Sequence, residues 1–322
     1  RKTTVRRVRN GLRRPLAAME METASLVLIG ITLFAAIVNG ALGYGFSSLT
    51  VPVALLFYTN RVLNPTMVLV EVAINIFVLF INRRSVPNVI KRVYPIMIGL
   101  LPGVLLGSYL LASLHPAWIK FCTYAILLPL ILVQAAGLRR PIRSERGFGL
   151  PFGAGIGFLY SVTTISGPPL AVLFNNQGLV KRDFLAALGL IRVAESGLTA
   201  LAYYHLGLFT HASTAMMPLI VPSVLIGIPL GTVLIRRLDP ETFRRICMTF
   251  DVWVVSFGLS RVLPELTLVR SPMSYSVFAL AMLLDAYLLY VFFKNKKARV
   301  WLPEMHSGPQ AAMDSATVPR PP

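Results

Sequence analysis

Apolar runs long enough to cross a bilayer as helix recur along nearly the whole chain. Such runs occupy residues 23–58, 63–82, 94–112, 117–136, 148–178, 184–206, 214–235, 243–262 and 272–293. A helix needs about 20 apolar residues to span the hydrocarbon core. A 14% share of charged residues is too low for the surface of a soluble protein of 322 residues. The sequence therefore predicts an all-α fold, that of a polytopic helical membrane protein.

Glycine and proline interrupt two of these runs. Residues 23–58 contain Gly40-Ala-Leu-Gly-Tyr-Gly45, and residues 148–178 contain Thr163-Thr-Ile-Ser-Gly-Pro-Pro169. At about 1.5 Å per residue, each run is too long for one straight crossing, so each is either a discontinuous helix or a re-entrant hairpin. Unpaired backbone groups survive at membrane depth only inside protein or facing a wet cavity. Matched breaks in two halves of a chain indicate a transporter's binding site.

The two broken runs fall at matching places in a predicted internal repeat. An offset of 124 residues (167 − 43) pairs Gly43 with Gly167, and it pairs the Gly103-x-x-x-Gly107 spacing with the one at 227–231. Seven of the sixteen positions between 101 and 116 are identical to their counterparts. Parallel repeats result if the broken runs cross the membrane once, and inverted repeats result if they fold back. The sequence leaves this choice open.

The repeat divides the chain into six expected parts. These are a basic N-terminal lead (1–22), a first membrane repeat (23–136), a basic linker (137–147), a second membrane repeat (148–262), an additional transmembrane helix (263–293) and a basic, then proline-rich, C-terminal tail (294–322).

Basic residues gather at the ends of the apolar runs and not on one face of a domain. The net charge of +18 resides largely in the first fifteen positions, in the connections and after the last run. That distribution is typical of segments at an anionic membrane face, so the lipid bilayer is the expected partner and nucleic acid is not. The two cysteines and four histidines show no ligand spacing, and we predict neither a metal site nor a cofactor.

Two carboxyl groups lie in the middle of apolar runs. Glu71 and Glu195 coincide under the offset of 124 (195 − 71), whereas Asp251 and Asp285 have no such partner. Ionisable groups at mid-membrane are costly and indicate function by default. We expect Glu71 and Glu195 to carry protons for coupled transport; the alternative is a structural role as hydrogen-bonded groups between helices.

Arg192 is a mid-membrane cation three residues before Glu195. This spacing places both side chains on one helix face. Arg192 is either an anion-binding group in the pore or an intrahelical partner that neutralises Glu195. In the latter case Glu71 is the better proton carrier.

The broken stretches offer backbone amides and hydroxyl groups to a ligand. A helix that resumes after a break points its N-terminus, with about half a positive charge, at the site, and small oxyanions suit that arrangement. The glycines at 103, 107, 227 and 231 are instead expected to allow close helix packing. The predicted substrate-binding residues are Asn39, Gly43, Tyr44, Gly45, Thr163, Thr164, Ser166, Gly167, Pro168 and Arg192.

The chain resembles the sulfite exporter family of the TauE/SafE type over about residues 23–262. The matching segments are Gly40-Ala-Leu-Gly-Tyr-Gly-Phe46, followed by Pro52, and Gly153-Ala-Gly-Ile-Gly-Phe158, leading to Ser166-Gly-Pro-Pro-Leu170. The resemblance implies a multi-pass secondary transporter of the bacterial inner membrane. The implied substrates are small sulfur-containing anions such as sulfite or organosulfonates.

Proton coupling separates the main hypothesis from its closest alternative. A coupled carrier uses titratable mid-membrane carboxyl groups, whereas an anion channel or uniporter of the same architecture does not need them. A membrane-embedded enzyme would need a nucleophile–base pair or metal ligands within the spans. The chain has no H-E-x-x-H or G-x-S-x-G motif, so we assign no catalytic residue.

Overall fold

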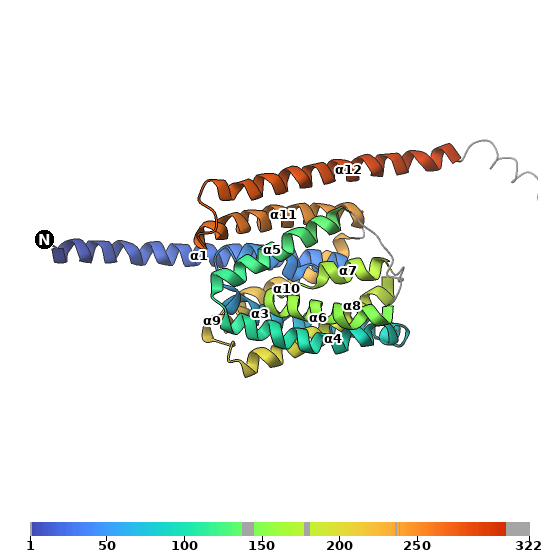
Figure 1. The fold of residues 1–322 in the computed structure, drawn as a ribbon, viewed down its shortest axis with the longest axis horizontal. Helices are drawn as coiled ribbons and strands as arrows, with labels where there is room; N and C mark the ends of the chain where they lie inside the picture. The colour runs from blue at the N-terminus through green and yellow to red at the C-terminus, as the bar shows by residue number, and fades with distance from the viewer. Residues whose placement is uncertain (1, 137–144, 177–180, 236, 238, 307–322) are drawn as a thin grey trace, which may run out of the picture.

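The computed structural model describes residues 2–136, 145–176, 181–235, 237 and 239–306, and within them it contains helices and no strands (Figure 1). The helices are α1 (Lys2–Leu42), α2 (Phe46–Ala54), α3 (Asn60–Ile81), η1 (Arg83–Ser85), α4 (Val86–Ser113), α5 (Pro116–Ala135), α6 (Glu145–Thr163), α7 (Gly167–Asn176), α8 (Lys181–His205), α9 (His211–Thr214), α10 (Met217–Leu234), α11 (Pro240–Glu265), η2 (Met273–Tyr275) and α12 (Ser276–His306).

Eight helical segments in the described residues are long and apolar enough to cross a membrane. They are Glu22–Leu42, Asn60–Ile81, Arg83–Ser113, Pro116–Ala135, Arg182–His205, His211–Leu234, Glu241–Glu265 and Met273–Lys294. The predicted all-helical, multi-pass membrane fold is confirmed. The apolar run 148–178 supplies none of the eight; its described residues are divided between α6 and α7.

Glycines bring two pairs of parallel helices into backbone contact. A Cβ built at Gly103 of α4 would collide with the carbonyl oxygen of Ala154 in α6, and one at Gly231 of α10 would collide with that of Ile37 in α1. Only glycine therefore permits these separations, and the predicted role of the glycines in close packing is confirmed. The same atoms give the register, because later residues of α4 meet later residues of α6, as Gly107 meets Ser161.

The first broken segment folds back on itself. α1 and α10 run in the same direction, since Ser223 donates a hydrogen bond to the Ile29 carbonyl and Gly231 packs on Ile37 further along. α3 begins beside α9, where Thr66 donates to the Ser213 carbonyl, and α9 directly precedes α10. α1 and α3 thus cross in the same direction, so α2 and residues 55–59 carry the chain back between them.

The second broken segment makes the same kind of return. α4 runs parallel to α6, and it begins beside the start of α8, where the Asn88 amide donates to Asp183 at 3.5 Å. α6 and α8 therefore cross in the same direction. α3 and α8 are antiparallel, because Gly189 near the start of α8 packs on Leu79 near the end of α3.

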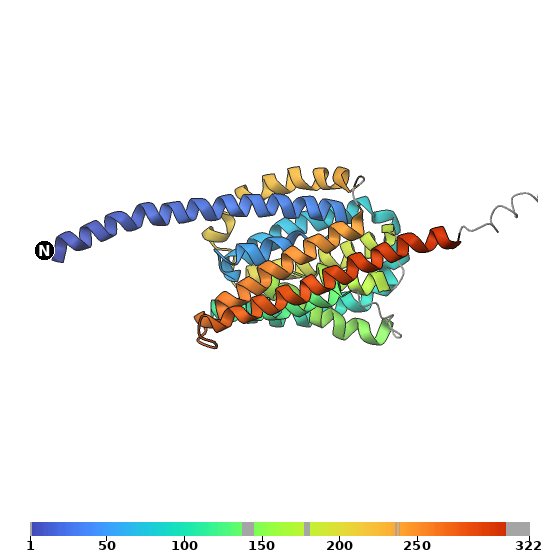
Figure 2. The same ribbon diagram turned by 90° about the horizontal axis from the view of Figure 1, so that it is seen from above.

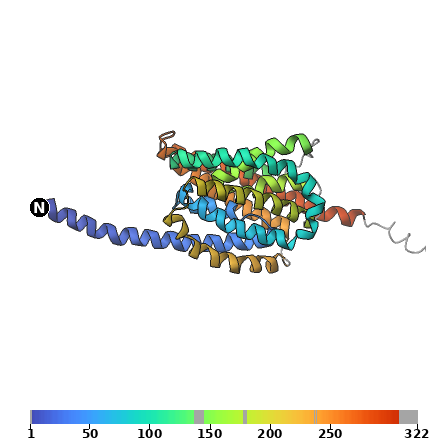
Figure 3. The ribbon, with the colours of Figure 1, turned by 90° about the horizontal axis from the view of Figure 1, so that it is seen from below.

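The helix directions decide the question that the sequence left open. The offset of 124 pairs α1 with α6 and α3 with α8, and the members of each pair run in opposite directions. The repeat itself stays a prediction, but its two halves, if matched in this way, are inverted. Inversion also places the N-terminal part of α1 at one end of the bundle and η1 at the other, so the basic segments do not all share one membrane face (Figures 2 and 3).

α12 packs along α11 at the edge of the bundle (Figures 1 and 2). A buried ion pair joins the two helices: Arg245 Nη2 lies 2.9 Å from Asp285 Oδ1, and the two residues are 3% and 0% exposed. Asp285, an isolated carboxyl group in the sequence, thus has a structural partner. The proline-rich residues 307–322 and most of the predicted linker (137–144) lie outside the described residues.

Gly153 and Gly155 of α6 offer a matched test of the close packing. A Cβ at Gly153 would collide with the Ile96 carbonyl oxygen, whereas nothing lies within 4 Å of one at Gly155. We expect Gly153→Ala to reduce the free energy of unfolding by about 1–3 kcal/mol or more, the usual cost of overpacking. Gly155→Ala should leave it unchanged or raise it. Reversible unfolding in mixed micelles measures both, and equal effects would contradict the packing role.

Candidate functional site

The first break lies between α1 and α2 and depends on glycine. Gly43 and Gly45 have φ angles of 83° and 109°, a left-handed region that side chains disfavour. Gly43 N donates to the Asn39 carbonyl, which closes the last turn of α1. Asn39 is 2% exposed, and its Oδ1 has no hydrogen-bond partner among the described residues.

The second break lies at Thr164–Ser166, where Thr164 has a φ of 58°. A helix ends with four carbonyl groups that lack helical partners, and lipid offers none. The last four carbonyls of α6, those of residues 160–163, each accept a hydrogen bond from another group: Thr164 N, Tyr203 Oη, Asn64 Nδ2 and Thr164 Oγ1. Side chains of α3 and α8 therefore supply hydrogen-bond donors to the carbonyl groups at the end of α6.

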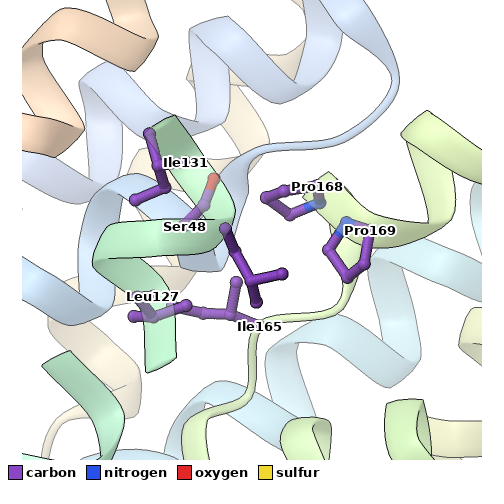
Figure 4. A pocket seen from close by; sticks show the side chains of 7 residues that line it. Ser48, Leu127, Ile131, Ile165, Pro168 and Pro169 are labelled. Atoms are coloured by element: carbon purple, nitrogen blue, oxygen red, sulfur yellow. The ribbon is translucent and has the colours of Figure 1, made fainter. Parts of the chain in front are cut away.

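The two breaks meet in the interior of the bundle. A Cβ built at Gly167 would lie 3.5 Å from Tyr44 Cβ. Figure 4 shows a small recess where Ser48 of α2 faces Ile165 and Pro168, with Leu127 of α5 beside them.

The adjacent prolines do not break the chain here. They occupy the first turn of α7, a position that proline tolerates because its missing N–H would have no helical partner. The non-helical residues come before them. As a consequence, the N-terminus of α7 offers fewer amide donors than the sequence analysis expected.

Three donors from three helices converge on the carboxylate of Glu71. Ser47 Oγ of α2 donates to Oε1 at 2.6 Å, Tyr160 Oη of α6 donates to Oε2 at 2.8 Å, and Arg192 Nη2 of α8 donates to Oε1 at 2.7 Å. Glu71 is 0% exposed and Arg192 is 4% exposed. Asn75, one turn further along α3, donates to the Arg192 carbonyl at 3.5 Å. The result is a buried ion pair between the two central helices.

Glu195 lies beside this pair but is bound differently. Its Oε1 accepts a hydrogen bond from Ser166 of the second break and lies 4.0 Å from Arg192 Nε. Its Oε2 has no partner among the described residues. Arg192 thus donates its hydrogen bond across the interface to Glu71 and not along its own helix to Glu195. The intrahelical pair with Glu195 is present at 4.0 Å, but the shorter contact of Arg192 is with Glu71 at 2.7 Å. Which of the two carboxyl groups carries a coupled proton stays a prediction.

The cluster carries two carboxyl groups and one guanidinium group. With both carboxylates ionised its formal charge is −1, and one proton makes it neutral. A net charge away from water is costly, so the cluster favours uptake of one positive charge. This arrangement can exchange a proton, and it holds three donors that an oxyanion could share.

Sequence reasoning found part of this cluster and missed the rest. The structure brings Glu71, Arg192, Glu195 and Ser166 together. Ser47 and Tyr160 were missed, although each is a polar residue at or next to a broken stretch. Tyr44 packs against Gly167 at the second break and lies beside Arg244 of α11.

Thr163 and Thr164 act on the backbone of the break. Thr163 Oγ1 donates to the Leu159 carbonyl and accepts from Ile165 N, while Thr164 Oγ1 donates to the Thr163 carbonyl. Neither hydroxyl contacts the carboxyl groups through these bonds. Their observed role is to hold the shape of the break.

Helix breaks that meet around buried charges, inside a bundle of membrane-spanning helices, define a membrane transport protein. The comparison with protein families agrees and is more specific: the model of the family described as "Sulfite exporter TauE/SafE" matches residues 28–257. The chain belongs to this family, whose members are multi-pass membrane transporters and not enzymes. No curated protein and no solved structure matches it. The matched region ends before α12.

The Glu71–Arg192 pair makes a prediction for stability. Arg192→Gln leaves two buried carboxyl groups without a cation, and removing one partner of a buried pair typically costs about 3–5 kcal/mol. The double variant Glu71→Gln/Arg192→Gln should recover most of that loss, because it carries only one carboxyl group. Unfolding in mixed micelles gives the free energies for a double-mutant cycle. A double variant less stable than Arg192→Gln alone would contradict the pairing.

Proposed function

We propose that this protein is a secondary transporter that exports or otherwise moves a small sulfur-containing anion across the bacterial inner membrane. Sulfite and organosulfonates are the substrate class. The observation that supports this most directly is the convergence of Ser47, Tyr160 and Arg192 on one buried carboxylate. Hydroxyl and guanidinium donors around a carboxylate suit the oxygens of a sulfur oxyanion equally well.

Glu71 acts as a resident anion in this proposal. In the absence of substrate its carboxylate accepts hydrogen bonds from all three donors, Ser47, Tyr160 and Arg192. Protonation of Glu71 removes its charge and weakens its ion pair with Arg192. The same three donors then bind the substrate anion. Uptake of a proton and uptake of an anion are thereby coupled, since each favours the other. Glu195, held by Ser166 and 4.0 Å from Arg192, takes part as the second proton carrier.

The broken stretches form the walls of the proposed anion site. The N-terminal end of α2 points Ser47 at the cluster, and its aligned peptide dipoles favour negative charge there. Gly43, Gly45 and Gly167 allow the backbone to approach the ligand. The remaining proposed contacts at these breaks are Asn39, Tyr44, Thr163, Thr164, Ser166 and Pro168.

Sulfite accumulation in proteoliposomes tests the coupling. One pH unit corresponds to about 1.36 kcal/mol, so a coupled proton should drive up to about tenfold accumulation per unit of gradient. Glu71→Gln cannot lose a proton at this position, and it should transport sulfite without gradient-driven accumulation. Protein-free vesicles control for passive permeation of protonated sulfite.

The same assay separates the carrier from its alternatives. A wild-type protein that equilibrates sulfite but never accumulates it is an anion channel or uniporter. Normal accumulation by Glu71→Gln would remove Glu71 from the coupling role.

A second experiment tests the role of Arg192 in binding with a matched control. Glu71→Gln/Arg192→Gln neutralises the central pair, and Asp285→Asn/Arg245→Gln neutralises the pair between α11 and α12, which is equally buried. We expect the first variant to insert but to lose sulfite binding by at least about tenfold, the effect of one charge-assisted hydrogen bond. The second should bind as the wild type does. Isothermal titration in detergent measures both affinities, and equal affinities would contradict the proposed anion site.

A further inference from the structure

Buried oxygen atoms without hydrogen-bond partners lie on α3 and α8, toward the end where α3 begins. Asn60 and Asn64 of α3 and Thr199 of α8 are all 0% exposed. Asn60 Oδ1, Asn64 Oδ1 and Thr199 Oγ1 have no partner in the part of the chain that the structure describes. An unpaired polar atom at membrane depth costs several kcal/mol. Three such atoms on two helices that pack against each other therefore indicate a ligand.

Hydrogen bonds place these residues close to one another. The amide nitrogens of Asn60 and Asn64 both donate to a single acceptor, the Val162 carbonyl, at 3.5 and 2.7 Å. Their free oxygens thus lie within a few ångströms of that carbonyl. Asn64 also lies beside the hydroxyl group of Tyr203.

The register of the antiparallel helices α3 and α8 gives the position of Thr199 along α8. Asn64 is level with Tyr203, and Glu71 is level with Arg192. Thr199 precedes Tyr203 by four residues, so it occupies the same face one helical turn away. Along α8 it therefore lies between Tyr203, which is level with Asn64, and the carboxyl cluster at residues 192–195.

The charge around this position is negative whenever Glu71 and Glu195 are both ionised. The unpaired atoms are acceptors in the two amides and a hydroxyl oxygen in Thr199. The C-terminal end of α6, which both asparagines contact, carries about half a negative charge from its peptide dipoles. The cluster of Glu71, Arg192 and Glu195 has a formal charge of −1 when both carboxyl groups are ionised. A cation satisfies the oxygens and the charge together, whereas an anion satisfies neither.

We propose that Asn60, Asn64 and Thr199 form a binding site for a monovalent metal cation of the Na⁺ type. Backbone carbonyls and the C-terminal ends of half-helices coordinate coupling Na⁺ ions in transporters, and the two side-chain amide oxygens here are carbonyl oxygens of the same chemical kind. Among the described residues no group of three His, Cys, Asp or Glu side chains gathers anywhere, so the donor set does not favour zinc. This inference deepens the proposed carrier function, on which it rests, by naming a second coupled ion.

Thermal unfolding of the full chain in lipid nanodiscs tests the site with Na⁺ as the probe. NaCl replaces choline chloride at constant ionic strength. A cation that binds only the folded protein raises the midpoint with the logarithm of its concentration, by about 5 °C at a hundredfold excess over Kd. Thr199→Val keeps the shape of the side chain but removes its oxygen, so it should lose this shift. Thr199→Ser, which keeps the oxygen, should retain it.

Thr32→Val is the matched control. Thr32 is also a fully buried threonine in a membrane helix, but its hydroxyl donates to the Leu28 carbonyl of its own helix at 2.7 Å. It should retain the Na⁺ shift. Equal wild-type midpoints in NaCl and choline chloride would overturn the proposal without the use of any variant, and so would a full shift in Thr199→Val.

The outcome for the cation site is separable from that for the carrier. Sulfite accumulation without any Na⁺ shift overturns the cation site and leaves the proposed carrier intact. A Na⁺ shift that Thr199→Val abolishes supports the cation site, even in a protein that fails to move sulfite.

Discussion

Satisfying polar groups away from water is the constraint on which the rest of this structure depends. Two helices end inside a bundle that lipid surrounds, and every backbone group exposed by those ends must find a partner in the protein. At the end of α6 the partners are Asn64, Tyr203 and Thr164. α3 and α8 must therefore lie against the break, and this requirement places their carboxyl and guanidinium groups beside it. The same two helices, α3 and α8, therefore satisfy the broken backbone and carry the buried charges.

Close packing supplies the rigid frame for that centre. Gly103 and Gly231 let α4 contact α6, and α10 contact α1, through backbone atoms. Such contacts set the helix separation directly by the backbone atoms, since a Cβ at either glycine would collide with a carbonyl group. The central pair of α3 and α8 adds polar contacts to its apolar packing, chiefly the bonds of Arg192 to Glu71 and of Asn75 to the Arg192 carbonyl. A bundle with an apolar frame and a polar centre suits a protein whose centre must change its charge and ligands during transport.

The buried charges also explain why ligands are coupled in the proposed mechanism. One guanidinium group faces two carboxyl groups, so the centre is short of one positive charge whenever both are ionised. A proton supplies that charge by neutralising a carboxylate, and a metal cation would supply it by binding near Thr199. An anion can enter only if the carboxylate of Glu71 gives up its donors. Coupling then follows from electrostatics in a medium of low dielectric constant and requires no separate regulatory element.

The sequence by itself determined the class of fold and the positions of its two breaks. Runs of about 20 apolar residues favour helix in a bilayer, where each backbone group needs a partner within its own segment. Glycine and proline mark the two breaks, although Pro168 and Pro169 themselves lie in the first turn of α7. The sequence also indicated Glu71, Glu195 and Arg192, because a charge in an apolar run is costly wherever it lies. The tertiary structure alone decided that the broken segments fold back and that Arg192 donates to Glu71 rather than to Glu195. Local spacing brings Glu195 nearer along the helix, but the choice depends on helix direction and packing across an interface, which no local pattern encodes.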